Sequence, residues 1–287
     1  MKPSGIQRIA VAVPQAEQFQ LFFASITEMM VNGYVTHHQR NFNISMRERG
    51  KEILNGADDI AEGMKASDKA RAFSFLSLNT IPDEMELVLR ENKQYCGTAH
   101  FYGVLPSSPI QKYQDMIDTI VIIIDEKATP FTENWIQNTD AGVCMIVVNN
   151  SPEQAKESAE EYLKNQANSL YALAVERMHS FHWYHPYGFQ SDGTRKPLGD
   201  ATPYGVEEIF WSIMRISATM RMNYLQKLAE EQGRMIQRRS GIFQKNSLRR
   251  RMELNQARGI YSMAVQGMYA VEQLLASAEG KPLAEDT

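Results

Sequence analysis

The residues best suited to chemistry follow short aliphatic segments in the first half of this chain. Asp125 comes directly after the run Ile120–Ile124, which is typical of a strand buried on both faces. In open α/β sheets, ligands bind beyond the carboxyl ends of the strands, and free amides at helix N-termini hold anions. The candidate residues for an anionic ligand are therefore Ser108, Asp125, Asn149 and Ser151, with Asp125 as the candidate catalytic residue, although strand-end residues of these types also serve as ordinary caps and turns.

Common catalytic and nucleotide-binding motifs are missing from the sequence. It contains no glycine-rich dinucleotide motif, no phosphate-binding glycine-lysine loop and no nucleophile elbow. No cofactor is predicted. The sequence leaves open whether the protein is an enzyme, and it favours a role without catalysis.

A second group of chemically capable residues is Glu176, His179 and His182. Residues three apart are neighbours on a helix, and Glu-x-x-His is a ligand unit of di-iron helical bundles. Such a site needs a second copy of the motif, which this chain does not have. We predict that these residues pack and hydrogen-bond among neighbouring aromatic side chains, and we predict no metal site.

A cluster of basic residues lies between positions 234 and 251. It holds seven positive charges and no acid, which leaves −11 on the rest of a chain whose net charge is −4. Arg249, Arg250 and Arg251 fall in the first turn of a predicted helix, where positive charge is disfavoured. The cluster is either a solvated basic tip or a contact for an acidic partner protein or a neighbouring subunit; the acidic pI of about 5.9 argues against nucleic acid. The predicted partner-binding residues are Arg238, Arg239, Lys245, Arg249, Arg250, Arg251, Tyr261 and Met268.

The second half of the chain has the periodicity of three long helices, over 151–184, 202–240 and 247–279. The last of them has the most regular pattern, because its apolar positions alternate steps of three and four as in a heptad seam. The seam consists of Leu254, Ala257, Tyr261, Ala264, Met268, Val271, Leu275 and Ala278. We predict that the three helices form an antiparallel bundle, closed on itself or open to a partner.

The first half alternates short apolar segments with helical ones. Strands are predicted over 7–13, 98–105, 119–125 and 143–149, and helices over 16–31, 67–77, 82–92 and 132–138. Ser45 and Glu48 have the spacing of a capping box, which predicts a helix over 45–64. The expected architecture is an α/β domain (1–150) with a small parallel or mixed sheet, followed by a domain of three long helices (151–287), mostly helical overall.

Targeting and redox signals are weak. The longest aliphatic run is far shorter than the ~20 residues that span a bilayer, and the apolar run near the start is too short for a signal peptide. Two cysteines, Cys96 and Cys144, form neither a disulfide framework nor a metal pair. We expect a cytoplasmic protein without a membrane span.

Two functional hypotheses follow. The first is a non-enzymatic structural or scaffold protein that forms a homo-oligomer, or docks into a larger assembly such as a virion or secretion particle, through its C-terminal helices. The second is an enzyme or small-molecule-binding protein that takes an anionic ligand at the carboxyl edge of the sheet.

Overall fold

The computed structural model describes eleven segments of the chain and three single residues. They are residues 4–13, 19, 22, 26, 35–48, 51–55, 85–104, 117–124, 141–148, 178–184, 187–189, 195–197, 206–239 and 248–281.

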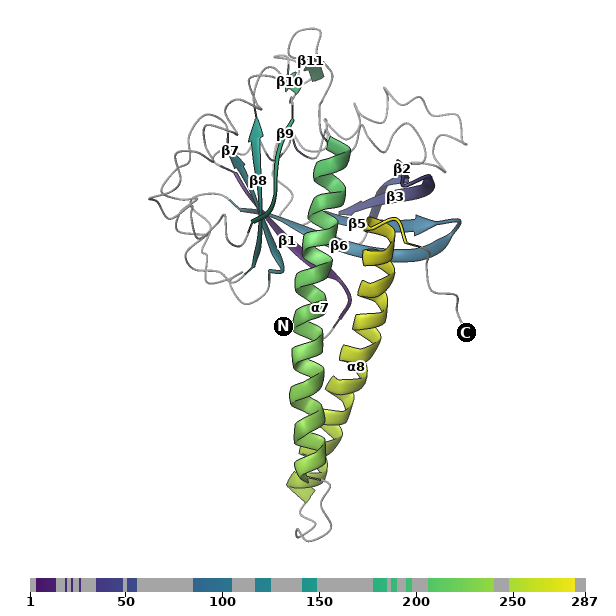
Figure 1. Ribbon diagram of the computed structural model, residues 1–287, viewed down its shortest axis with the longest axis vertical. Helices are drawn as coiled ribbons and strands as arrows, with labels where there is room; N and C mark the ends of the chain where they lie inside the picture. The colour runs from purple at the N-terminus through teal and green to yellow at the C-terminus, as the bar shows by residue number, and fades with distance from the viewer. Residues whose placement is uncertain are drawn as a thin grey trace.

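A nine-stranded mixed sheet forms the body of the molecule (Figure 1). Its strand order is β2-β3-β5-β6-β1-β7-β8-β9, and β4 pairs with β3. β6, β1, β7, β8 and β9 run parallel, whereas β2, β3, β4, β5 and β6 pair antiparallel. The strands are β1 (Gln7–Ala12), β2 (Val35–His37), β3 (Arg40–Glu48), β4 (Lys51–Asn55), β5 (Met85–Glu91), β6 (Gln94–Val104), β7 (Thr119–Ile124), β8 (Gly142–Val148) and β9 (Met178–Tyr184). A separate pair consists of β10 (Tyr187–Phe189) and β11 (Arg195–Pro197).

Two tight turns connect strands in the antiparallel part of the sheet. His38 and Gln39 have φ of 48° and 63°, and Asn92 and Lys93 have φ of 48° and 69°. Two consecutive residues with positive φ give the turn whose twist matches that of paired strands. These turns join β2 to β3 and β5 to β6.

Two long helices follow the sheet, α7 (Val206–Arg239) and α8 (Leu248–Ala278). They lie side by side and antiparallel; α7 contacts β1, β7, β8 and β9, and α8 contacts β6. Figure 1 shows that half of this hairpin lies over the sheet and that the rest projects beyond it. The hydrophobic core joins buried side chains of the sheet to those of the sheet-covering half, including Phe42, Phe101, Phe210, Trp211 and Leu274.

Several predicted elements are confirmed. Strands lie at 7–12, 94–104, 119–124 and 142–148, within a few residues of the expected bounds, and β1, β7 and β8 are parallel. Helices lie at 206–239 and 248–278. Within the predicted helix over 16–31, the described residues Phe19, Phe22 and Ile26 are helical and buried.

The predicted bundle of three long helices is wrong. Residues 178–184 form β9, which extends the sheet by pairing parallel with β8 along the register Val143–Met178 to Val148–Tyr184. Within the described segments, two long helices pack on the sheet and on each other. Over the described segments the fold is therefore mixed α/β, with a large sheet and two long helices at the C-terminal end, and these segments are not mostly helical.

Two shorter predicted helices are also wrong. Ser45 lies in β3 and its hydroxyl accepts a hydrogen bond from Arg90 at 3.2 Å, so it caps no helix. Residues 85–91, predicted as helical, form β5, with Met85, Leu87 and Leu89 buried at alternate positions. Pairing with β3 and β6 on either side overrides the helical spacing of these residues.

Other predictions fall outside the described residues, namely the helices over 67–77 and 132–138 and the segment 151–177. Neither α7 nor α8 has an apolar stretch long enough to cross a membrane.

Two glycines of α8 allow a direct test of this packing. A Cβ added at Gly267 would lie 3.1 Å from Leu225 Cδ1 and 3.2 Å from the backbone of Ser4 and Gly5, whereas one added at Gly259 meets nothing within 4 Å. Gly259→Ala should therefore raise the free energy of unfolding by about 0.5–1 kcal/mol through helix propensity. Gly267→Ala should lower it by about 1 kcal/mol, because the N-terminal segment must move away. Denaturant unfolding measures both, and equal stabilisation by the two would contradict the packing.

Candidate functional site

The projecting hairpin is held to the sheet by a buried ion pair. Arg221 of α7 lies with its Nη2 3.0 Å from Oδ2 of Asp118, and their side chains are 0% and 2% exposed. Asp118 immediately precedes β7, and its Oδ2 also accepts a 2.8 Å hydrogen bond from the backbone N–H of Arg8 in β1. One carboxylate thus links the starts of two parallel strands to the middle of α7.

Two backbone hydrogen bonds fix the position of Asp118 itself. The N–H of Asp118 donates to the carbonyl of Arg8, and the N–H of Gly142 donates to the carbonyl of Asp118. Gly142 is required by its surroundings, because an added Cβ would lie 2.6 Å from Cγ2 of Ile216 in α7. Burial raises the pKa of Asp118 to about 6, against the attraction of Arg221 and the hydrogen bond from Arg8.

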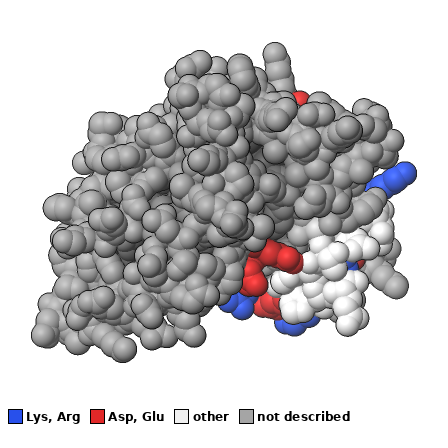
Figure 2. Space-filling view, turned by 90° about the horizontal axis from the view of Figure 1, so that it is seen from above, with Lys and Arg blue, Asp and Glu red and all other residues white. Residues whose placement is uncertain are grey.

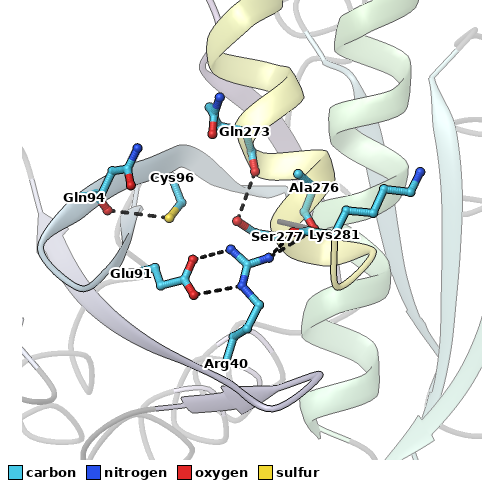
Figure 3. Close-up of polar contacts among 8 residues, drawn as sticks. All are labelled: Arg40, Glu91, Gln94, Cys96, Gln273, Ala276, Ser277 and Lys281. Carbon is cyan, nitrogen blue, oxygen red and sulfur yellow. Dashed lines mark hydrogen bonds and ion pairs between the residues drawn. The ribbon is translucent and has the colours of Figure 1, made fainter. Parts of the chain in front are cut away.

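The C-terminal end of α8 has its own polar anchor, drawn in Figure 3. Arg40 donates to the carbonyls of Ala276 and Lys281 and forms an ion pair with Glu91. The last carbonyls of a helix lack partners within the helix, and its negative end favours a cation. Arg40 therefore fixes the end of α8 to the β2–β3 turn.

His37 makes a second contact with this end. Its Nε2 lies 3.1 Å from the carbonyl oxygen of Ala278, and its ring stacks on Trp211 of α7 with centroids 4.3 Å apart. Burial lowers the pKa of His37, so the neutral ring is favoured. The β2–β3 turn thus contacts both helices.

At the far tip of the hairpin, the predicted basic cluster has partners of its own. Arg239 and Arg249 both form ion pairs with Glu253, the latter at 3.2 Å, and Arg250 donates to the carbonyl of Arg239 at the end of α7. Arg250 and the Arg239–Glu253 pair therefore join the two helices at the tip, whereas Arg249 pairs with Glu253 within α8. Arg238 and Arg251 are exposed, and Lys245 lies outside the described residues.

Several large apolar side chains of α8 stay exposed where α7 and the sheet do not cover the helix, and we call them together the outer face. Seven large hydrophobic side chains are exposed in the described part of the chain, and six of them belong to α8. These six, which define the outer face, are Leu248, Met252, Tyr261, Met263, Val265 and Tyr269. Large apolar side chains exposed together on one helix are typical of a contact with another molecule.

Some residues of the heptad seam are buried between the helices, and others are partly exposed. Ala257, Ala264 and Val271 are buried and Met268 is half-buried, whereas Tyr261 is 42% exposed. The Tyr261 ring lies beside Gly233 of α7, 3.8 Å from the position of a Cβ there. Tyr261 thus lies at the boundary between the seam and the outer face.

The outer surface of α7 is different. Lys227, Glu230, Glu231 and Arg234 are exposed there, and Arg234 pairs with Glu230 one turn away at 3.4 Å. At the other end of the molecule, seen from above in Figure 2, basic and acidic side chains lie beside an uncharged area. Within the described part of the chain, the outer face of α8 is distinguished by its exposed apolar side chains.

The other predicted site residues are not brought together by the described segments. Ser108, Asp125, Asn149, Ser151 and Glu176 lie outside them. His179 and His182 belong to β9, so the helical spacing behind the metal hypothesis does not apply to them. Among the described residues, no group of three or more His, Cys, Asp and Glu side chains has the geometry to hold a metal ion.

Sequence reasoning missed the Asp118–Arg221 pair. The two residues are 103 positions apart in the sequence, so no local pattern connects them. A weak signal was available, since Arg221 interrupts the apolar face of α7 between Ser217 and Leu225.

Comparison with known proteins gives no family for this chain. No protein-family model matches it, and no curated protein is significantly similar to it in sequence.

Replacing Arg221 should give a stability loss that depends on pH. The pKa of Asp118 is about 6 in the fold, above its usual 3.8, so its contribution to stability is complete below about pH 4 and is lost as the pH rises through 6. Arg221→Met removes the attraction that opposes this shift and raises the pKa further. The variant should be about 3 kcal/mol less stable than the wild type near pH 8 and closer to it near pH 5.

The control for this prediction is the double variant Arg221→Met with Asp118→Asn, which carries no titrating carboxyl. Its free energy of unfolding should lose the extra pH dependence of the single variant. A stability difference between wild type and Arg221→Met that stays constant from about pH 5 to about pH 8 would show that Asp118 does not titrate as stated.

Proposed function

We propose that this protein is a non-enzymatic structural or scaffold component that associates with protein chains through the outer face of α8. The observation that carries the proposal is the concentration of exposed apolar side chains on this one helix. Interface cores are rich in tyrosine and methionine and poor in charge, and the outer face has this composition.

The stretch from Gly259 to Val271 carries no charged residue, although many of its side chains are exposed. A helix that stays in water over its whole length normally carries charges on its outer side, as α7 does. Burial against another protein would account for this difference between two neighbouring helices.

The fixed base of the hairpin supports the same role. The buried Asp118–Arg221 pair and the Arg40 contacts hold both helices to the sheet. A surface that is already rigid loses little conformational entropy when it binds. The start of α8 lies in the part of the hairpin that projects beyond the sheet (Figure 1).

Light scattering across micromolar concentrations tests this proposal. The wild type should have a mass above that of the 32.7 kDa chain, and Val265→Glu, which places a charge in the centre of the outer face, should reduce it to the monomer. Lys227→Glu on the exposed side of α7 is the matched control and should leave the mass unchanged. A wild type that stays monomeric throughout would contradict the proposal.

A second candidate function rests on the order of the strands. After β1 the chain continues into strands that lie on one side of it, up to β6, and after β7 it continues to β8 and β9 on the other side. The carboxyl ends of β1 and β7 are therefore a topological switch point, where open α/β sheets bind their ligands. Asp125 is the residue that follows β7 in the chain.

A thermal-shift screen of small phosphates and carboxylates tests this second function. A compound that binds at the switch point should raise the melting temperature of the wild type but not that of Asp125→Asn, whose melting temperature without ligand should be nearly that of the wild type. Glu52→Gln, at an exposed position of β4, should respond like the wild type. An equal response of Asp125→Asn would remove Asp125 from the site.

A further inference from the structure

Beyond its first two turns, α8 carries few charges. From Leu254 to Ala278 the helix has only two charged residues, Arg258 and Glu272, and both are exposed. They are fourteen residues apart, which is roughly 21 Å along a helix, so they cannot pair with each other. Arg258 lies seven residues before Val265, and Glu272 lies seven residues after it.

These residues belong to one row along the side of α8. Its members follow one another at steps of three or four, with the average of 3.5 that keeps a row facing a partner helix. None of them is buried, and Tyr261, Val265 and Tyr269 are 42%, 40% and 45% exposed. The row consists of Arg251, Leu254, Arg258, Tyr261, Val265, Tyr269, Glu272, Ala276 and Glu279.

The row reads symmetrically about Val265. Tyr261 and Tyr269 lie four residues from it, and Arg258 and Glu272 lie seven residues from it. Farther out, Leu254 is matched by Ala276 and Arg251 by Glu279. At equal distances on either side of Val265, a tyrosine is thus matched by a tyrosine, and each arginine is matched by a glutamate.

We propose that a second copy of this chain packs its α8 antiparallel against this row, with the two Val265 side chains meeting at a two-fold axis. This rests on the proposed function and names the partner. In an antiparallel pair, Arg258 of one copy lies opposite Glu272 of the other, and each Tyr261 lies opposite a Tyr269. A two-fold interface requires a surface complementary to itself, and the row has that property.

The side of α8 opposite the row is occupied. Its Gly267 lies against Gly5, where an added Cβ would be 3.2 Å from the Gly5 nitrogen, and Leu274 lies against Gly97 of β6. Ala264 and Val271 are buried at the helix interface. From Arg258 to Glu272 every member of the row is exposed, whereas Leu254 and Ala276 are half-buried. Glu279 already forms an ion pair with Lys281 at 2.6 Å, so the tests below use the Arg258–Glu272 pair.

Charge exchange tests the pairing. Arg258→Glu alone and Glu272→Arg alone each place like charges opposite one another at two symmetric positions, and each should weaken dimerisation about tenfold or more. The double variant Arg258→Glu with Glu272→Arg restores both pairs and should dimerise within about threefold of the wild type. Sedimentation equilibrium measures all dissociation constants, and circular dichroism checks that each variant is folded.

The matched control exchanges the charges of Glu230 and Arg234 on α7, an exposed pair outside the row. Neither single change nor the exchange should alter dimerisation. If the wild type associates but the double variant remains as weak as the single ones, the antiparallel pairing is overturned while the proposed function stands. A monomeric wild type overturns both.

Cysteine cross-linking locates the axis independently. Val265→Cys should form a disulfide-linked dimer under mild oxidation, because the two side chains meet at the axis, whereas Gln266→Cys, exposed on another side of α8, should not. The native Cys96 and Cys144 are buried and need no replacement. Equal cross-linking at 265 and 266 would place the contact elsewhere.

Discussion

The direction of the helical hairpin depends on one buried ion pair. Arg221 and Asp118 are removed from water, and each needs the other, because an uncompensated charge at that depth is strongly unfavourable. Apolar packing alone would allow α7 to slide along the sheet, since hydrophobic contacts have no preferred direction. The pair, together with the amide of Arg8, allows one position of the helix relative to β1 and β7. We therefore regard it as a determinant of geometry more than as a source of net stability.

The remaining polar contacts support the same geometry from the other helix. Arg40 and His37 bind the last carbonyls of α8, and Trp211 of α7 stacks on His37. Both helices are thus fixed at the sheet, while Glu253 and Arg250 join them at the tip. The outer face of α8 lies between these two fixed ends, which makes it a preorganised surface.

The candidate interface was predictable in part. The heptad spacing predicted helix α8, but periodicity alone could not separate the residues that α7 covers from those left exposed. Of the two seam residues assigned to a partner, Tyr261 is exposed, whereas Met268 is half-buried and packs against the core. The arginines at 249–251 were assigned to a partner because their positive charge is unfavourable at a helix start. In the structure Arg250 binds the end of α7, and such a partner becomes visible only once the chain has turned back on itself.

By itself, the sequence determined the features that depend on local periodicity and composition, namely the helices 206–239 and 248–278 and the aliphatic strands β1, β7 and β8. Tertiary structure decided where local preference and long-range pairing conflict. Ser45 carries a helix-capping signal yet lies in β3, and residues 178–184 were predicted as helix yet complete the sheet beside β8. A strand is stabilised by hydrogen bonds to neighbours that are distant in sequence. Its stability therefore cannot be predicted from the residues of the strand alone.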